Sequence, residues 1–91
     1  MQKTLKSADY ARLIDLLVAV RKSADIRQQT LAKKLGRPQS FVAKYENGER
    51  RLDIIEFIAV ARALGADPVK LFKGYVGGKG APKAALKRST K

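Results

Sequence analysis

Two short stretches of helical periodicity, separated by only three residues, constrain the fold of this chain more than any other feature. Apolar residues recur at helical spacing on both sides of the break, at Leu31, Leu35, Val42 and Tyr45. This pattern predicts helices over about residues 28–35 and 39–45. The connection Gly36-Arg37-Pro38 is read as a tight turn, since Gly suits a left-handed helix end and Pro suits a helix start. We expect Ala32 where the two helices cross closely, because its side chain is small.

Helical periodicity also predicts three further helices. The first spans about residues 10–22, with Ser7 or Asp9 as its cap, and the last two span about 53–64 and 68–72. The side chains expected to face the core from these last two helices are Ile54, Phe57, Ile58, Ala61, Leu64, Val69 and Phe72. No segment alternates apolar and polar residues with a period of two. The predicted fold class is therefore all-α, a bundle of five helices with short loops.

The composition narrows the classes of function. The chain has 20 Lys and Arg against 8 Asp and Glu, a net charge of +12, with no Cys and no His. Disulfides, thiolate nucleophiles, His-based catalysis and Cys/His metal sites are excluded, so we expect no enzyme, no cofactor and no metal. The densest apolar run, residues 13–20, is shorter than the roughly 20 residues that span a bilayer, so a cytoplasmic protein is expected. The basic charge favours a nucleic-acid partner, although a basic chain can also be merely well solvated.

A change in composition predicts the domain boundary. Four glycines fall within residues 74–80, which disfavours a helix there. We therefore predict a folded domain over 1–75 and a flexible basic tail over 76–91. Five basic and no acidic residues lie in this tail, namely Lys79, Lys83, Lys87, Arg88 and Lys91. Two interpretations remain open for it, a disordered soluble terminus or electrostatic contact with a DNA backbone.

The second helix of the pair has a polar outer face. When Val42 and Tyr45 face inward, the residues left outside are Gln39, Ser40, Ala43 and Lys44. Gln can pair with adenine, Ser can donate or accept, Ala can touch a thymine methyl, and Lys can reach guanine or phosphate. Such a face could be an ordinary solvated surface, but a helix held off the body by its predecessor can also enter a major groove.

In order and spacing, these segments resemble the Cro/repressor-type, or xenobiotic-response-element-type, helix-turn-helix family. The resemblance runs from about residue 13 to 72. The matching pieces are Val20-Arg21, Gln28, Leu31-Ala32, Leu35-Gly36, Gln39-Ser40, Val42, Glu46-Asn47-Gly48, Arg50-Arg51, Ala63-Leu64-Gly65 and Asp67-Pro68. The resemblance implies a five-helix, lambda-repressor-like DNA-binding domain with helix-turn-helix at its second and third helices. It also implies duplex DNA as partner and a homodimer on a palindromic site. One departure is Pro38, which stands where the family often has a Ser or Thr cap.

The resemblance also implies roles for individual residues. Base reading falls to Gln39, Ser40, Ala43 and Lys44. Phosphate contact falls to Gln28, Asn47 and Gly48, and we extend it to Arg50 and Arg51, which flank this loop. Phe41 falls near the base-reading positions and is implied to approach phosphate or a thymine methyl. Gln28 is also implied to brace Gln39. Arg21 and Glu46 match a charged pair that ties the first helix to the end of the recognition helix.

The sequence thus predicts a DNA-binding transcriptional regulator, cytoplasmic and associated with the bacterial nucleoid when bound. A single small module makes few contacts, which favours a homodimer. The expected dimer surface is Ala66, Pro68, Val69, Leu71 and Phe72. Two alternatives remain open: an antitoxin-like module that binds DNA and a toxin or other small protein, and a non-specific architectural DNA binder.

Overall fold

Five α-helices make up the part of the chain that the computed structural model describes, residues 7–77. Their bounds are α1 Ala8–Ser23, α2 Gln28–Leu35, α3 Gln39–Glu46, α4 Ile54–Ala63 and α5 Pro68–Gly77. No strand occurs in this range. The predicted all-α, five-helix fold is confirmed, and the predicted bounds of the second helix are those of α2. Apart from Val76 and Gly77, the predicted tail over 76–91 lies outside the described residues.

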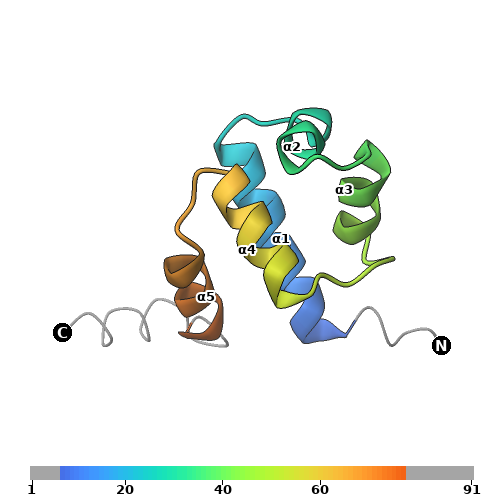
Figure 1. The fold of residues 1–91 in the computed structure, drawn as a ribbon. Coiled ribbons are helices and arrows are strands. Elements are labelled where there is room, and N and C mark those ends of the chain that lie inside the picture. Colours follow the sequence, from blue (N-terminus) through green and yellow to red (C-terminus); the bar gives the residue numbers. More distant parts are fainter. Residues whose placement is uncertain (1–6, 78–91) are drawn as a thin grey trace.

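The helices are arranged around one core. Helix α2 packs against α3 and α4, α4 packs against α5, and α1 packs against α3 and α5. In Figure 1 the α2–α3 pair and α5 lie at opposite sides of the molecule. The buried side chains of the core are Tyr10, Ile14, Leu17, Leu31, Ala32, Phe41, Val42, Tyr45, Phe57, Val60 and Leu64. Helices α2 and α3 are therefore both anchored by their inner faces, and the outer face of α3 is not packed against another helix.

Local capping sets the helix starts. Of the two predicted caps for α1, Ser7 acts: its Oγ accepts a hydrogen bond from the Tyr10 amide at 3.1 Å. Helix α4 begins with a reciprocal capping box, in which Asp53 accepts from the Glu56 amide and Glu56 accepts from the Asp53 amide. These side chains satisfy amide groups that a helix start leaves without a backbone partner.

Helix α5 extends to Gly77, so the predicted end at Phe72 is wrong. The extra turn is held by contacts to α1. The Tyr75 hydroxyl donates to the Asp9 carbonyl oxygen at 2.8 Å, and the Arg12 guanidinium lies 4.5 Å from the centre of the Tyr75 ring. Each glycine in a helix is unfavourable by about 1 kcal/mol relative to alanine. The tertiary contacts of Tyr75 offset this local preference at Gly74.

Three apolar side chains depart from their predicted positions. Ile54 and Val69 were expected in the core but are 59% and 70% exposed, and Phe72 is 49% exposed with its ring edge toward Phe57. Val60 is fully buried and takes the inward position on α4. Ile54, the first residue of α4, and Val69, the second residue of α5, both line an open groove between these two helices.

Candidate nucleic-acid interface

The turn between α2 and α3 has the geometry that its sequence predicts. Gly36 adopts a left-handed conformation with φ +69° and ψ 33°, and its amide donates to the Lys33 carbonyl oxygen at 3.1 Å. A residue with a Cβ is strained in this conformation. Pro38 precedes the first residue of α3 and makes no side-chain cap, and its carbonyl oxygen instead accepts from the Phe41 amide at 3.0 Å. Helix α3 thus starts at Gln39 despite the missing polar cap.

Helix α3 has one buried and one open face. Val42 and Tyr45 are fully buried. Three of the four predicted base-reading side chains, Gln39, Ser40 and Lys44, are exposed, and Ala43 is half-buried. These side chains supply hydrogen-bond donors and acceptors, a methyl group and a positive charge on one surface.

A chain of hydrogen bonds fixes the start of this open face. Gln39 Nε2 donates to Gln28 Oε1 at 3.4 Å, and Gln28 Nε2 donates to Glu46 Oε1 at 2.8 Å. The structure therefore places Gln28 against Gln39, at the position expected of a bracing residue. Because both amides are oriented, Gln39 presents its side chain in a defined direction.

Glu46 is itself held by a buried ion pair. Arg21 Nε and Nη2 donate to the two carboxylate oxygens of Glu46 at 2.7 and 3.1 Å, and Arg21 Nη1 donates to the Ile26 carbonyl oxygen at 2.8 Å. The side chains of Arg21 and Glu46 are 11% and 7% exposed. This bidentate pair ties α1 to the end of α3, and through Gln28 it also ties in the start of α2.

The loop after α3 is anchored to the body by Tyr10. Its hydroxyl donates to the Arg50 carbonyl oxygen at 3.0 Å and accepts from the Leu52 amide at 3.1 Å. Asn47 is exposed, whereas Gly48 is buried and its amide donates to the Tyr45 carbonyl oxygen at 3.1 Å. The Gly48 amide, one of the predicted phosphate contacts, is thus already engaged. The Arg51 guanidinium lies 4.8 Å from the centre of the Tyr10 ring.

Phe41, a predicted phosphate contact, lies in the core instead. It is 7% exposed and its ring stands edge-on to Tyr45 at 5.6 Å. Its position on the helix puts it between the open and the buried face, and burial of an aromatic ring is favourable. The guanidinium groups of Arg37 and Arg50 lie 4.3 and 4.9 Å from its centre.

Arg37 and Glu56 join Arg50 in one cluster, and neither is among the residues singled out from the sequence. Glu56 accepts two hydrogen bonds from Arg50, at 2.9 and 2.8 Å, and one from Arg37 at 3.2 Å. The hydrogen bonds from Arg50 and then from the Asp53 amide lower the pKa of Glu56 to about 2, and the same contact raises the pKa of Arg50. The acid three residues after Asp53 signals the capping box, but no local pattern signals the contacts with two arginines.

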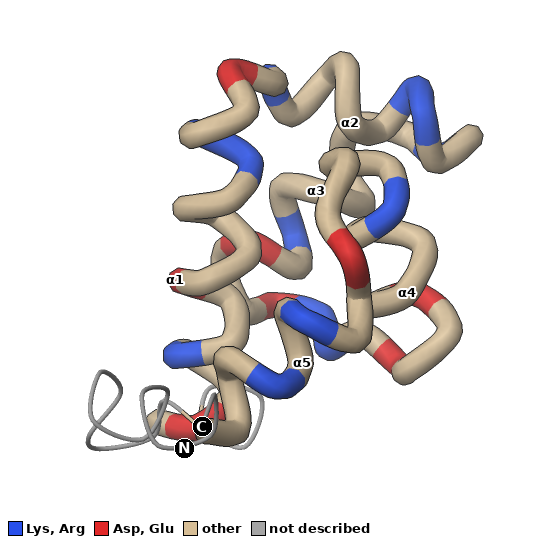
Figure 2. Tube along the Cα trace, turned by 90° about the vertical axis from the view of Figure 1, so that its left-hand side faces the viewer, with Lys and Arg blue, Asp and Glu red and all other residues tan. Residues whose placement is uncertain are grey.

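The helix-turn-helix segment is basic without acidic residues. Residues 27–45 contain five basic side chains and no carboxylate, the five being Arg27, Lys33, Lys34, Arg37 and Lys44. Helix α2 contains Lys33 and Lys34 and no Asp or Glu, which agrees with its blue and tan colouring in Figure 2. The net positive charge of this segment attracts a polyanion.

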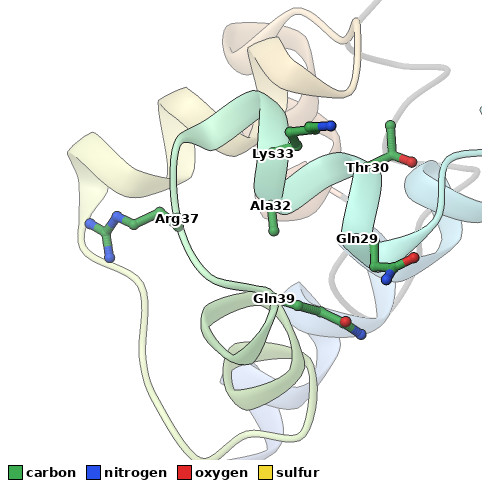
Figure 3. Close-up of a pocket in the computed structure, with 6 residues that line it drawn as sticks. All are labelled: Gln29, Thr30, Ala32, Lys33, Arg37 and Gln39. Atoms are coloured by element: carbon green, nitrogen blue, oxygen red, sulfur yellow. The ribbon is translucent and has the colours of Figure 1, made fainter.

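An open hollow of about 480 Å³ lies between α2 and the start of α3. Its lining residues are Gln29, Thr30, Ala32, Lys33, Arg37 and Gln39. In Figure 3 Gln29 and Gln39 extend to the same side, while Arg37 extends to the other side of the turn. The polar and basic lining suits a hydrated anionic partner better than an apolar ligand.

A second, apolar groove of about 270 Å³ lies between α4 and α5, and is lined by Ile54, Phe57, Ile58, Arg62, Pro68, Val69 and Phe72. Of the predicted dimer residues, Val69 and Phe72 are exposed and line this groove, and Ala66 and Pro68 are half-buried. Leu71 packs against the core. Leu71 was predicted on the dimer surface, but its side chain is partly buried against the core and is less available to a second copy than Val69 and Phe72.

Within residues 7–77, no helix is long and apolar enough to cross a membrane, and no three carboxylates gather as metal ligands.

Comparisons with known proteins bear on this arrangement. The helix-turn-helix family model matches residues 17–71. An XRE-family-like protein from Pseudomonas syringae pv. tomato str. DC3000 is 50% identical, with a TM-score of 0.77 over 79% of this chain and 88% of its own. The restriction-modification controller protein C.AhdI from Aeromonas hydrophila is 30% identical, with a TM-score of 0.66 over 72% of this chain and 100% of its own. The clp gene regulator ClgR from C. glutamicum, 17% identical, shares the fold with a TM-score of 0.70 over 84% of this chain and 99% of its own. A search of curated proteins gives no match.

Proposed function

The chain belongs to the Cro/C1-type, or XRE-type, family of helix-turn-helix DNA-binding transcription regulators, and from this premise we propose that two copies read a palindromic operator in successive major grooves. The observation that carries the proposal is the open face of α3. Gln39, Ser40 and Lys44 are exposed there, and Gln39 is oriented by Gln28. A side chain fixed before binding loses less conformational entropy when it pairs with a base.

The proposed division of labour follows from chemistry and exposure. Gln39, Ser40, Ala43 and Lys44 read base edges. Gln28, Asn47, Arg50 and Arg51 contact the phosphate backbone and set the register of the helix on the duplex. The protein acts in the cytoplasm, on the bacterial nucleoid when it is bound. The similarity to a restriction-modification controller supports a role in transcriptional control.

The first test of the proposal is selection of bound DNA from a random duplex pool at about 150 mM salt, where non-specific attraction is screened. We expect enrichment of an inverted repeat whose halves lie about 34 Å apart, one helical turn. If no sequence is enriched, operator reading is contradicted and the architectural alternative is favoured. Co-purification of a small neighbouring protein would favour the antitoxin-like alternative.

Variants then test the base-reading role of Gln39. Gln39→Ala should lower affinity by about 1–3 kcal/mol at one base position and relax the preference there. Gln29→Ala is the matched control, since Gln29 is an exposed glutamine on α2 at the same hollow. If Gln39→Ala weakens operator and random DNA by the same factor, base reading by Gln39 is wrong.

The groove between α4 and α5 supports the proposal of a dimer. Val69 and Phe72 expose apolar surface there, and a second copy could cover it. Val69→Asp should yield a monomer in sedimentation equilibrium and weaken operator binding. Ile55→Asp is the control for the oligomeric state alone, because Ile55 is equally exposed, at 69% against 70%, and does not line this groove, but it lies beside Arg37 and Glu56. A Val69→Asp protein that stays dimeric would remove this surface from consideration.

A further inference from the structure

One carboxylate holds two arginines that approach it from different segments. Arg37 belongs to the turn before α3 and Arg50 to the loop after it, and Glu56 lies in the first turn of α4. Glu56 Oε2 accepts from Nη2 of both arginines, at 3.2 Å from Arg37 and 2.8 Å from Arg50. Glu56 Oε1 accepts from Arg50 Nη1 and from the Asp53 amide, each at 2.9 Å. This group of Arg37, Arg50 and Glu56 is called the arginine clamp below.

The ring of Phe41 forms the base of the arginine clamp. Both guanidinium groups lie within 5 Å of its centre, at 4.3 and 4.9 Å. Aromatic faces attract guanidinium groups at such distances. Phe41 is 7% exposed and belongs to the core, so this support is rigid.

The arginine clamp keeps donors and positive charge for a further anion. The side chains of Arg37 and Arg50 are 42% and 38% exposed, whereas that of Glu56 is 12% exposed. Arg50 Nη1 also donates to the Arg51 carbonyl oxygen at 2.8 Å, and each guanidinium still carries more N–H groups than its contacts use. Two positive charges against one negative charge leave the cluster cationic, and the carboxylate lies on its inner side.

We propose that Arg37 and Arg50 together bind one phosphate of the DNA backbone and that Glu56 is the positioning residue that aligns them. The inference rests on the proposed function and adds Arg37 and Glu56 to it. A helix in a major groove has a phosphate backbone on each side. Gln28 lies with Gln39 on one side of α3, while Arg37 extends to the other side of the turn. The arginine clamp therefore serves the backbone strand that Gln28 does not reach.

The geometry of the carboxylate suggests a sharp test, Glu56→Gln. The amide oxygen can keep the position of Oε1, with its hydrogen bonds from Asp53 and Arg50. The amide nitrogen then stands at the position of Oε2, where it cannot accept from the two Nη2 groups. Asp53→Asn is the matched control: it makes the same change in net charge at the same helix start, and Asn is an equally good cap.

Binding of a labelled random-sequence duplex is measured by fluorescence anisotropy over a range of NaCl concentrations, with the full chain. The proposal predicts that Glu56→Gln binds about tenfold more weakly, although it is one charge more positive. Its slope of log affinity against log salt should flatten by about 0.9, the value of one phosphate. Asp53→Asn should bind as tightly as the unaltered protein or more tightly. If Glu56→Gln also binds more tightly, Glu56 only neutralises charge and the proposal is wrong.

Thermal unfolding followed by circular dichroism checks whether Glu56→Gln is folded. If it is not, a second variant, Arg37→Ala, tests the proposal. Arg37→Ala removes an exposed side chain with one hydrogen bond and should flatten the salt slope by about 0.9. Lys73→Ala, an equal charge change on α5, should flatten it less, since α5 lies on the far side of the molecule from α3. Equal slopes for the two variants would overturn the clamp. Failure of the unaltered protein to bind any duplex would instead overturn the proposed function itself.

Discussion

Removal of Glu46 should destabilise the fold far more than removal of both members of its ion pair. Glu46→Leu leaves the guanidinium of Arg21 buried, and within the described residues only the Ile26 carbonyl oxygen remains as its hydrogen-bond partner. It also removes the acceptor of Gln28. Uncompensated burial of one charge by removal of its partner is unfavourable by about 3–5 kcal/mol. A paired replacement, Arg21→Met with Glu46→Leu, leaves no buried charge and fills much of the same volume.

These magnitudes are large compared with the stability of a domain of this size. At roughly 0.05–0.15 kcal/mol per residue, the 71 described residues should have a free energy of unfolding of about 4–11 kcal/mol. A loss of 3 kcal/mol lowers the midpoint of thermal unfolding by about 12 °C or more, at 4 °C or more per kcal/mol for such small domains. The single variant should thus be partly unfolded under conditions in which the paired variant is folded.

The assay is urea unfolding followed by far-ultraviolet circular dichroism, on the unaltered protein, both single variants and the paired variant. The double-mutant cycle isolates the interaction between the two positions. We expect the paired variant to be more stable than either single variant. A paired variant as unstable as the worse single variant would refute the reasoning, because it would mean that packing and not the stranded charge sets the loss.

Three further predictions concern single groups. Tyr45→Phe should leave the free energy of unfolding unchanged or raise it by up to about 1 kcal/mol, because the Tyr45 hydroxyl is buried without a hydrogen-bond partner in the described part of the chain; a clear loss in urea unfolding would indicate a hidden partner. Gly74→Ala should raise the free energy of unfolding by about 1 kcal/mol, since Gly74 is helical with open space around it, whereas Gly36→Ala, at φ +69°, should lower it by about 1–2 kcal/mol. The pKa of Glu56 is lowered from 4.5 to about 2, so its ion pair with Arg50 should stabilise the fold fully above pH 4.5 and lose this effect as the pH falls to about 2. The difference in free energy of unfolding between the unaltered protein and Glu56→Gln should therefore shrink over that range. A difference that stays constant with pH would contradict the ion pair as its cause.

The fold was predictable where local chemistry decides the backbone. Gly36 and Pro38 bracket the turn between α2 and α3, and Asp53 marks the start of α4. Each acts within a few residues of itself, so the sequence pattern carries the information. The end of α5 was missed because it depends on the contact of Tyr75 with Asp9, residues 66 positions apart, which no local pattern encodes.

The candidate site divides along the same line. The outward position of Gln39, Ser40 and Lys44 follows from helical periodicity alone. The arginine clamp could not be predicted in this way, because the contact of Arg37 with Glu56 requires that the turn before α3 lie next to the start of α4. From the sequence alone, Arg37 is interpreted as a solvated surface cation and Glu56 only as the second residue of a capping box with Asp53.

Two of the few carboxylates in this basic chain orient the polar and basic side chains that we propose to contact DNA. Glu46, the last residue of α3, and Glu56, in the first turn of α4, each accept hydrogen bonds from arginine, and their side chains are 7% and 12% exposed. Glu46 aligns Gln28 and through it Gln39, and Glu56 aligns Arg37 and Arg50. A free arginine side chain loses about 1.5–2 kcal/mol of conformational entropy when it is ordered, and here the ordering precedes contact with DNA. Replacing either glutamate by a neutral residue therefore raises the net positive charge of the protein and should still lower its affinity for duplex DNA. Net charge and affinity would then change in opposite directions.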